Sequence, residues 1–354
     1  MKRLLSVLLI LVLLGAFAFA GGKQEAAAAP EAMTAEPMIA AMATDVGGLG
    51  DKSFNDGAYE GLLRGEAFGF EARVIESKQQ TDYVPNLSGL AEDGADIVFA
   101  VGFLMEEAVK EAAAQNPDTF FGGIDIGGSD DLDNFQGILY KEQESGFLAG
   151  IVAGLMTMEY ASASPKLNDD NVIGVVLGMF IPPVEKYEVG FIQGAKYVNP
   201  DVEVLSVTSG SFVDQAKGKE AALAMVEQGA DIIFHAAGLT GLGAIQAAKE
   251  AGVLAIGVDV DQNAVAPDTV LTSAVKKIPE SIEVVLESIA NGTFMGGTQV
   301  YGLEQGATGI SSFNSFAGVV PQAVKDAVAE ATAKILSGEI VIATTRAELE
   351  AILR

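Results

Sequence analysis

A carboxylate, an aromatic ring and an amide lie close together in a glycine-rich segment near the start of the chain. They are Asp45, Phe54 and Asn55, and they follow the apolar run 38–43, which is typical of a β-strand. In an open α/β sheet, the turn after a strand is where ligands bind. These groups suit a small polar ring compound, because they offer a ring to stack on and an acceptor and donors for its edges. The alternative interpretation is a solvated loop that only caps the helix expected from residue 57 onward.

Other predicted strands are followed directly by aromatic or sulfur-containing side chains. We interpret these as candidate walls of the same ligand site, and packing inside the protein is the alternative for each. Phe180 is the first choice for stacking, since the two prolines after Ile181 stiffen its turn. The candidates are Phe103, Met105, Met179 and Phe180.

Polar or small residues end further strands in the same way. Asp125 follows the run 120–124, and Gly238 follows the run 232–235. Asp259 could accept two hydrogen bonds from a vicinal diol such as a sugar ring offers, or serve as a helix cap or hinge contact. Lys276 could donate to sugar oxygens, pair with Asp259 in an empty cleft, or lie on the surface.

The motifs of familiar enzymes and cofactor sites are missing from the sequence. There is no G-x-S-x-G elbow, H-E-x-x-H helix, Walker lysine loop or dinucleotide fingerprint after the first strand. With no cysteine and with His235 as the single histidine, little remains for a metal cluster or a Ser-His pair. The acidic residues at 130–133 do not have the spacing of a calcium loop. We therefore expect a binding protein with no catalytic residue, metal or cofactor.

The charge of the chain limits its partners. The formal net charge is −27, and such a surface repels the phosphates of nucleic acids and anionic lipid headgroups. We expect no nucleic-acid partner. A neutral or cationic small ligand fits better than a polyanion.

The first residues have the features of a secretory signal. Lys2 and Arg3 precede the apolar core 4–14 and the small-residue exit 16–20. Residues 1–20 are therefore predicted to be a signal peptide, with an uncleaved anchor as the alternative. The segment 21–37 is rich in Ala, Glu and Pro and is interpreted as a flexible tether. We expect a protein secreted across the inner membrane to the periplasm or the outer face of the plasma membrane.

From residue 38 the chain alternates between strand-like and helical patterns, which predicts parallel sheets covered on both faces. The series restarts near residue 172, which favours two similar α/β lobes with a ligand cleft between them. We expect residues 38–150 mainly in the first lobe, 171–275 mainly in the second, and 276–354 to supply crossover segments that complete both. The predicted strands are 38–43, 71–76, 96–101, 120–126, 135–139, 172–177, 202–207, 231–235, 254–260 and 270–274, and the predicted helices are 57–69, 84–92, 105–116, 185–199, 214–228, 241–251 and 279–290.

Several segments resemble the basic membrane protein family, the PnrA-like purine nucleoside receptors that serve as substrate-binding components of ABC importers. The Asp-Lys-Ser-Phe-Asn and Val-Asp-Val-Asp-Gln sequences are the most specific, and the resemblance covers nearly all of the chain after the tether. The matching segments are 44–48, 51–55, 146–150, 190–194, 258–262 and 271–276.

This resemblance implies a type I periplasmic-binding-protein fold, with two Rossmann-like lobes that close around a nucleoside. It also implies an ABC transporter permease as partner, and we expect a monomer. For the second stacking ring we place Phe180 ahead of Phe234. The other positions that the resemblance implies are Phe54 for stacking on the base, Asp45 and Asp125 for the base edge, and Gly238, Asp259 and Lys276 for the ribose.

The chain departs from the family pattern in two places. Members often have a lipid-modified cysteine at the cleavage site, whereas Gly21 and Gly22 follow Ala20 here. Leu239 stands where members of the family usually have a glycine. We expect its side chain to narrow the ribose side of the ligand cleft or to change which ligand is bound. Two other functions stay open: a protein of the same fold that binds a sugar or another small polar molecule, and an enzyme such as a nucleoside hydrolase.

Overall fold

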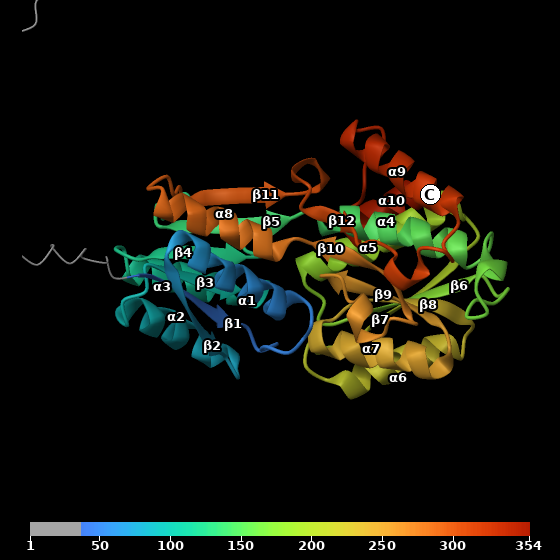
Figure 1. Cartoon of the computed structure of the whole chain (residues 1–354), viewed down its shortest axis with the longest axis horizontal. Coiled ribbons are helices and arrows are strands. Elements are labelled where there is room, and N and C mark those ends of the chain that lie inside the picture. Colours follow the sequence, from blue (N-terminus) through green and yellow to red (C-terminus); the bar gives the residue numbers. More distant parts are fainter. Residues whose placement is uncertain (1–36) are drawn as a thin grey trace, which may run out of the picture. The chain divides into compact units, whose positions relative to one another are not determined.

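The computed structural model describes residues 37–354, which form two α/β lobes (Figure 1). Each lobe contains a six-stranded sheet with helices on both faces. This architecture confirms the predicted fold class. The predicted signal peptide and all of the predicted tether except Pro37 lie outside the described residues.

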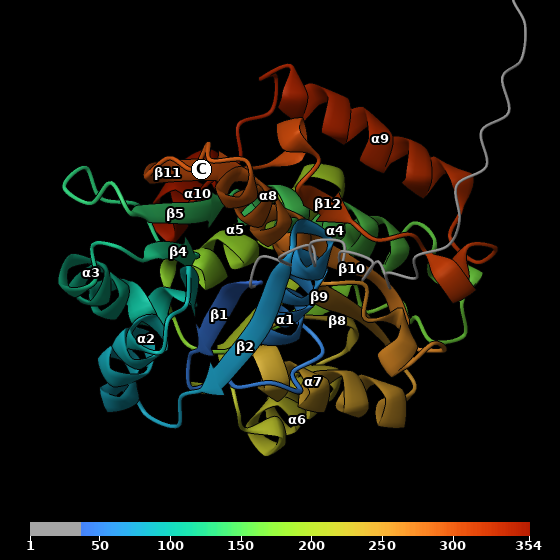
Figure 2. The same cartoon turned by 60° about the vertical axis from the view of Figure 1, so that its left-hand side comes forward.

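The sheet of the first lobe is parallel throughout, in the order β11-β5-β4-β3-β1-β2. Its central strands are buried on both faces, which explains why their sequences are continuously apolar rather than alternating. Both views place β11 beside β5, although the two are far apart in the chain (Figure 2). The strands are β1 (Met38–Thr44), β2 (Phe70–Glu76), β3 (Ile97–Val101), β4 (Phe120–Ile124), β5 (Phe135–Tyr140) and β11 (Gly297–Tyr301).

Helices cover both faces of this sheet, and alternate residues of β1 pack against the two layers. Ala40 and Met42 pack with α1 (Phe54–Arg64) and α8 (Ile278–Ala290). Ala41 and Ala43 pack with α2 (Tyr83–Glu92) and α3 (Glu106–Gln115). The period of two along the strand therefore sets both layers of the core.

The second sheet has the order β12-β10-β9-β8-β6-β7 and is parallel except for the antiparallel pair of β10 and β12. The helices α4 (Glu142–Met156), α5 (Pro182–Val198) and α9 (Gln322–Leu336) share one core with it, and α6 (Gln215–Val226) and α7 (Gly238–Ala251) share another. The helix α10 (Arg346–Leu353) packs on α5. The strands are β6 (Val172–Leu177), β7 (Glu203–Thr208), β8 (Ala230–Ala236), β9 (Leu254–Asp259), β10 (Val270–Lys276) and β12 (Thr308–Ile310).

The chain crosses between the lobes after β5, after β10 and between β11 and β12. The first turn of α4 ties these crossovers together. Glu144 Oε2 accepts hydrogen bonds from Leu303 N (2.6 Å) and Thr308 Oγ1 (2.8 Å). Ser145 Oγ donates to Val275 O (2.6 Å) and accepts from Gly309 N (2.8 Å).

Two of the segments that carry the family resemblance serve helix packing. A Cβ atom on Gly150 of α4 would lie 2.1 Å from the carbonyl oxygen of Phe191, and one on Gly194 of α5 would lie 2.0 Å from that of Phe147. Only glycine allows the two backbones to approach so closely. These glycines therefore hold α4 against α5.

Several elements differ from the predictions. The helix expected at 57–69 begins at Phe54 and ends at Arg64, followed by a 3-10 turn. The strand expected at 120–126 ends at Ile124, because Asp125 takes a left-handed φ of +64°. The helix α4 was not predicted: it begins within the range 38–150, which we expected mainly in the first lobe, but it packs in the core of the second lobe. The other elements without a prediction are β11, β12, α9 and α10.

Candidate functional site

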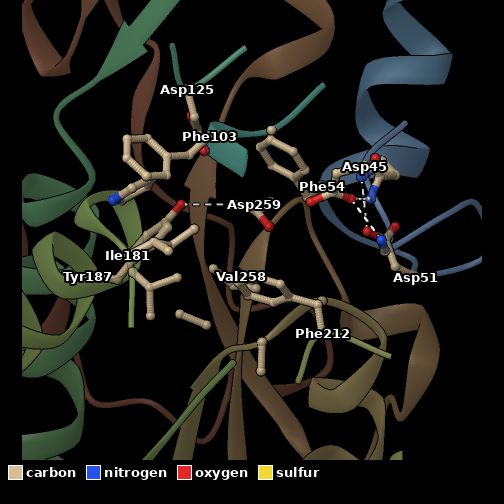
Figure 3. Close-up of a pocket in the computed structure, with 18 of the residues that line it drawn as sticks. Asp45, Asp51, Phe54, Phe103, Asp125, Ile181, Tyr187, Phe212, Val258 and Asp259 are labelled. Atoms are coloured by element: carbon tan, nitrogen blue, oxygen red, sulfur yellow. Dashed lines mark hydrogen bonds between the residues drawn. The ribbon is translucent and has the colours of Figure 1, made fainter. Parts of the chain in front are cut away.

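A cavity lies where the carboxyl ends of strands from both sheets meet, and residues of both lobes line it. It holds about 570 Å³ of space not filled by protein atoms, its open mouth included. Figure 3 shows Asp45 and Asp51 on one side of this space, Ile181 and Tyr187 on the opposite side and Asp259 between them. This is the place in an open α/β sheet at which ligands bind.

The turn after β1 is folded around Asp51. Its carboxylate accepts hydrogen bonds from the backbone N–H groups of Ser53 (3.0 Å), Asn55 (2.9 Å) and Asp56 (3.1 Å). These are the donors at the start of α1 that would otherwise lack a partner. Asp51 therefore starts the helix early and fixes Phe54 and Asn55 at the cavity.

Asp45 and Asn55 form a buried polar pair at this side of the cavity. Asp45 Oδ1 accepts from Gly47 N (2.8 Å) and Asn55 Nδ2 (3.3 Å). Asn55 Oδ1 is buried and has no hydrogen-bond partner among the described residues. Because a buried unpaired acceptor is unfavourable, this oxygen is a candidate acceptor for a donor on a bound molecule.

Burial raises the pKa of Asp45 to about 6, although the hydrogen bonds from Gly47 and Asn55 act in the opposite direction. Burial likewise raises the pKa of Asp51 to about 6 against its backbone hydrogen bonds. At neutral pH both groups are still mainly ionised. Asp45 therefore faces the cavity as a hydrogen-bond acceptor.

Apolar groups from the second lobe form the opposite wall. Phe212, in the loop between β7 and α6, lines the cavity, as Phe54 does from the first lobe. The prolines at 182 and 183 begin α5, where proline is well tolerated, and so bring its first turn to the cavity. The other apolar lining residues of this lobe are Ile181, Pro183, Val184, Ala236, Ala237, Leu239 and Val258.

Lys276 is a fully buried cation among carboxylates. Its Nζ donates to both oxygens of Asp125 (2.9 and 2.8 Å) and lies 3.4 Å from Glu142 Oε1 and 3.9 Å from Asp259 Oδ1. Burial lowers the pKa of Lys276, but the carboxylates outweigh it and leave the pKa above its ordinary value. The Nζ atom also lies 4.8 Å from the centroid of the Phe54 ring, a cation–π distance. Lys276 is therefore ionised and held beside the aromatic wall.

Asp259 joins the two lobes at the cavity. Its Oδ2 accepts from Ser53 Oγ (2.6 Å) in the first lobe, and its Oδ1 accepts from Tyr187 Oη (3.2 Å) in the second. Burial raises the pKa of Asp259, and Lys276 opposes this. Asp125 and Asp259 both take left-handed φ values, +64° and +62°, which non-glycine residues rarely adopt and which tend to cluster at binding sites.

Eight of the eleven predicted ligand-binding residues line this cavity, and Met105, Met179 and Phe180 do not. Met105 is fully buried in the core of the first lobe. The ring of Phe180 is half exposed and stacks on the Arg346 guanidinium, 4.4 Å from its centroid. Met179 lies in the bend before α5 and is partly exposed. The turn after β6 thus presents Ile181 to the cavity, in place of these two residues. The eight are Asp45, Phe54, Asn55, Phe103, Asp125, Gly238, Asp259 and Lys276.

Phe234 and His235 also lie off the cavity. Phe234 is buried in the core against Phe191 and Tyr187. The ring of His235 is buried with its Nε2 2.9 Å from Gln262 Oε1. Because that oxygen also accepts from Val258 N (2.9 Å), Nε2 is the donor in the pair. Burial lowers the pKa of His235 to about 4, so the ring is neutral.

The prediction missed Phe212 and Tyr187. Phe212 was detectable, because it follows the apolar strand 202–207 after a short Ser-Gly-Ser turn, just as Phe54 follows the first strand. Tyr187 lies within a helix at core spacing, so its hydroxyl gave no signal in the sequence. In the part of the chain that the structure describes, no group of acidic or histidine side chains is arranged to hold a metal ion. None of the helices described there is long and apolar enough to cross a membrane.

Comparison with known proteins identifies the family. Residues 38–346 match the model of the family described as ABC transporter substrate-binding protein PnrA-like. The chain belongs to this family. Its members are extracytoplasmic substrate-binding components of ABC transporters, which implies a small-molecule ligand and a transporter partner.

Relatives and solved structures agree with this assignment. Basic membrane protein A of Borreliella burgdorferi is 33% identical over 315 residues, which cover 87% of this chain and 88% of the relative. An uncharacterized lipoprotein of Pyrococcus furiosus is 33% identical over 286 residues, covering 77% of this chain and 70% of the relative. The crystal structure of an ABC transporter solute-binding protein from Aeropyrum pernix K1 has a TM-score of 0.81 and 27% identity, and the match covers 90% of this chain and 96% of that one. The type I periplasmic-binding-protein fold and the solute-binding role are thereby established.

Proposed function

We propose that this solute-binding protein carries a purine nucleoside, with the base between Phe54 and Phe212. The observation that supports this most is the pairing of an aromatic ring from each lobe on one cavity that also holds buried acceptors. Every base has a π-face, and stacking on an aromatic side chain contributes about 1–3 kcal/mol per base. Phe212 takes the role that the sequence suggested for Phe180.

The base edge would meet Asp45, Asn55 and Asp125. Asn55 Nδ2 donates to Asp45, which leaves its Oδ1 without a partner among the described residues and able to accept from a ligand. A purine with ring or exocyclic N–H groups supplies such donors. Leaving the buried Asn55 Oδ1 without a donor costs about 1–3 kcal/mol, which favours ligands that carry one.

The ribose would lie at Asp259, Lys276 and Gly238. Asp259 accepts hydroxyl hydrogens already, from Ser53 and Tyr187, and the hydroxyls of a ribose are donors of the same kind. The buried carboxylates at Lys276 outnumber it, since Asp125, Glu142 and Asp259 all lie within 4 Å of its Nζ. This excess of negative charge favours a neutral nucleoside over a nucleotide.

Location and assembly follow from the same proposal. The predicted signal at 1–20 supports export to the periplasm or the outer face of the plasma membrane. There the protein would bind its ligand as a monomer by lobe closure and deliver it to an ABC permease.

Calorimetric titration of the ligand-stripped protein tests the ligand class. The panel is adenosine, guanosine, inosine, cytidine, uridine and ribose, with Phe212→Leu as the matched variant. We expect purine nucleosides to bind with Kd of about 1 µM or tighter, and Phe212→Leu to weaken them. Binding of ribose alone, or of no compound in the panel, would reject a nucleoside as the ligand while leaving the family intact. Release of free base from inosine would instead reveal a hydrolase.

A further inference from the structure

Glu142 is a buried carboxylate that does not line the ligand cavity but contacts a lysine that does. It is the first residue of α4, just after the first crossover, and 1% of its side chain is exposed. Its Oε1 lies 3.4 Å from Lys276 Nζ, and its Oε2 lies 3.1 Å from Lys186 Nζ. Because a buried charge needs partners, the two ammonium groups fix this carboxylate between them.

The two lysines belong to different elements of the structure. Lys276 ends β10 at the second crossover and reaches the cavity. Lys186 belongs to α5 of the second lobe and also donates to the carbonyl oxygen of Tyr140, the last residue of β5 (2.9 Å). The series Lys276, Glu142 and Lys186 therefore connects the cavity to two of the segments at which any movement between the lobes must bend.

The hydrogen bonds of Lys276 leave one position for adjustment. Two of its three N–H donors point to the oxygens of Asp125, at 2.9 and 2.8 Å. The third faces Glu142 at 3.4 Å, while Asp259 at 3.9 Å is beyond hydrogen-bond distance. This third N–H is the least tightly engaged, so a ligand oxygen would share it with Glu142 in a bifurcated hydrogen bond while Glu142 keeps the ammonium in place.

We propose that Glu142 is a positioning residue, which holds the Lys276 ammonium ready for a ligand oxygen and links that contact to Lys186 at the crossover. The inference rests on the proposed function, since a ribose oxygen is the group that would take the hydrogen bond. Glu142 therefore contributes to binding of the sugar part of the ligand and not to binding of the base.

A ligand-free measurement tests the link itself. In the whole protein labelled with ¹⁵N at the lysine side chains, Glu142→Gln removes the charge but keeps the shape of the side chain. We expect the ammonium signals of both Lys276 and Lys186 to shift and to exchange with water faster than in the wild type. The matched control is Glu144→Gln, a buried glutamate on the same helix turn that bonds to Leu303 and Thr308. Unchanged lysine signals in Glu142→Gln would overturn the proposal.

A binding measurement tests the role. The ratio of affinities for adenosine and for free adenine separates the sugar contribution from that of the base. Glu142→Gln should weaken adenosine about tenfold, as expected for loss of a charge-assisted contact, and leave adenine within about twofold. Glu144→Gln should change both affinities equally, because it acts on the crossovers alone. Equal losses for both compounds in Glu142→Gln would show a merely structural residue.

Two further experiments cover the cases in which the variant does not fold or the ligands do not bind. Should Glu142→Gln not fold, Glu142→Asp keeps the charge but withdraws it from Lys276, and the same change in the ratio is expected at smaller size. Should the wild type bind neither adenosine nor adenine, the proposed nucleoside function fails. The lysine signals would then still decide whether Glu142 holds Lys276.

Discussion

The two lobes have the same strand order but present different chemistry to the cavity. Read from the same edge, β11-β5-β4-β3-β1-β2 corresponds to β12-β10-β9-β8-β6-β7, strand for strand. After β1 the first lobe places Asp45, Phe54 and Asn55 at the cavity. After the equivalent β6 the second lobe places Ile181 and the apolar first turn of α5 there. The same scaffold thus lines the cavity with polar groups from the first lobe and with a mainly apolar wall from the second.

The same difference between the lobes is seen at two single residues, Asp125 and Asp259. They occupy equivalent positions at the ends of β4 and β9 and take nearly the same left-handed φ, +64° and +62°. Asp125 bonds both of its oxygens to Lys276, whereas Asp259 accepts from one hydroxyl of each lobe. Equal backbone geometry therefore serves two tasks: Asp125 balances a buried cation, and Asp259 accepts from neutral hydroxyl donors.

The largest effect is expected on stability, where substitutions of Asp125 and Asp259 should differ. Asp125→Ala leaves Lys276 without its nearest carboxylate, so the free energy of unfolding should fall by about 3 kcal/mol. Asp259→Ala removes a partner of two hydroxyl groups and should cost about half as much. Chemical denaturation of the ligand-free protein measures both. Equal losses would mean that the two aspartates are interchangeable.

The second largest effect is expected on the choice between nucleosides and free bases, which should depend on Asp259. Asp259→Ala removes the acceptor for ribose hydroxyls, so nucleosides should bind about 30-fold more weakly while free bases change by less than about threefold. Titration of adenosine and adenine into the variant measures the two effects. A similar weakening of both would contradict the assignment of Asp259 to the ribose.

The two aromatic walls are expected to contribute alike. Phe54→Leu and Phe212→Leu should each weaken purine nucleosides about tenfold, because leucine keeps the apolar contact but loses stacking on the base. Ile181→Val on the same wall is the control and should change the affinity by less than about threefold. An unchanged affinity in both Phe variants would indicate a ligand without a base, such as a sugar.

Acid pH should weaken ligand binding through Asp45 in the first lobe, and this effect should be smaller than those of the substitutions above. The pKa of Asp45 is about 6, so protonation removes its acceptor, and binding should be about fourfold weaker at pH 5.5 than at pH 7. The stability change has the opposite sign. A carboxyl group whose pKa is raised by folding destabilises the folded state above that pKa, and the cost is relieved as pH falls through about 6 toward 4. Burial also raises the pKa of Asp231, in β8, to about 6, so Asp45, Asp51 and Asp231 all add stability as pH falls through this window.

Titration at a series of pH values, together with unfolding at the same pH values, checks both signs. In Asp45→Asn the affinity should be low and nearly independent of pH. A pH dependence that persists in Asp45→Asn would assign the effect to another group.

Much of the site could be predicted because parallel strands bring their carboxyl ends to one edge. That rule placed Asp45, Asp125, Asp259 and Lys276 correctly at strand ends, and the structure brings all four to one cavity. It could not decide which residue of a turn faces inward. At β6 the prolines begin α5 so early that Ile181 points to the cavity while Phe180 stacks on Arg346.

The helices and strands that were not predicted lack a clear alternation of polar and apolar residues in the sequence. Nearly every residue of α4 is buried, so its sequence has no polar face to reveal a helix. The edge strands β11 and β12 are short, and their partners lie far away in the chain. The contact of Lys276 with Asp125 likewise joins residues 151 positions apart, so only the folded chain shows which carboxylate Lys276 prefers.

A crystal structure of the protein with a purine nucleoside would show directly whether one aromatic ring from each lobe holds the base. We predict the base between Phe54 and Phe212, its edge at Asp45 and Asn55, and the ribose hydroxyls at Asp259 and Lys276. A nucleoside bound with its sugar between the two rings, or outside this cavity, would contradict the account.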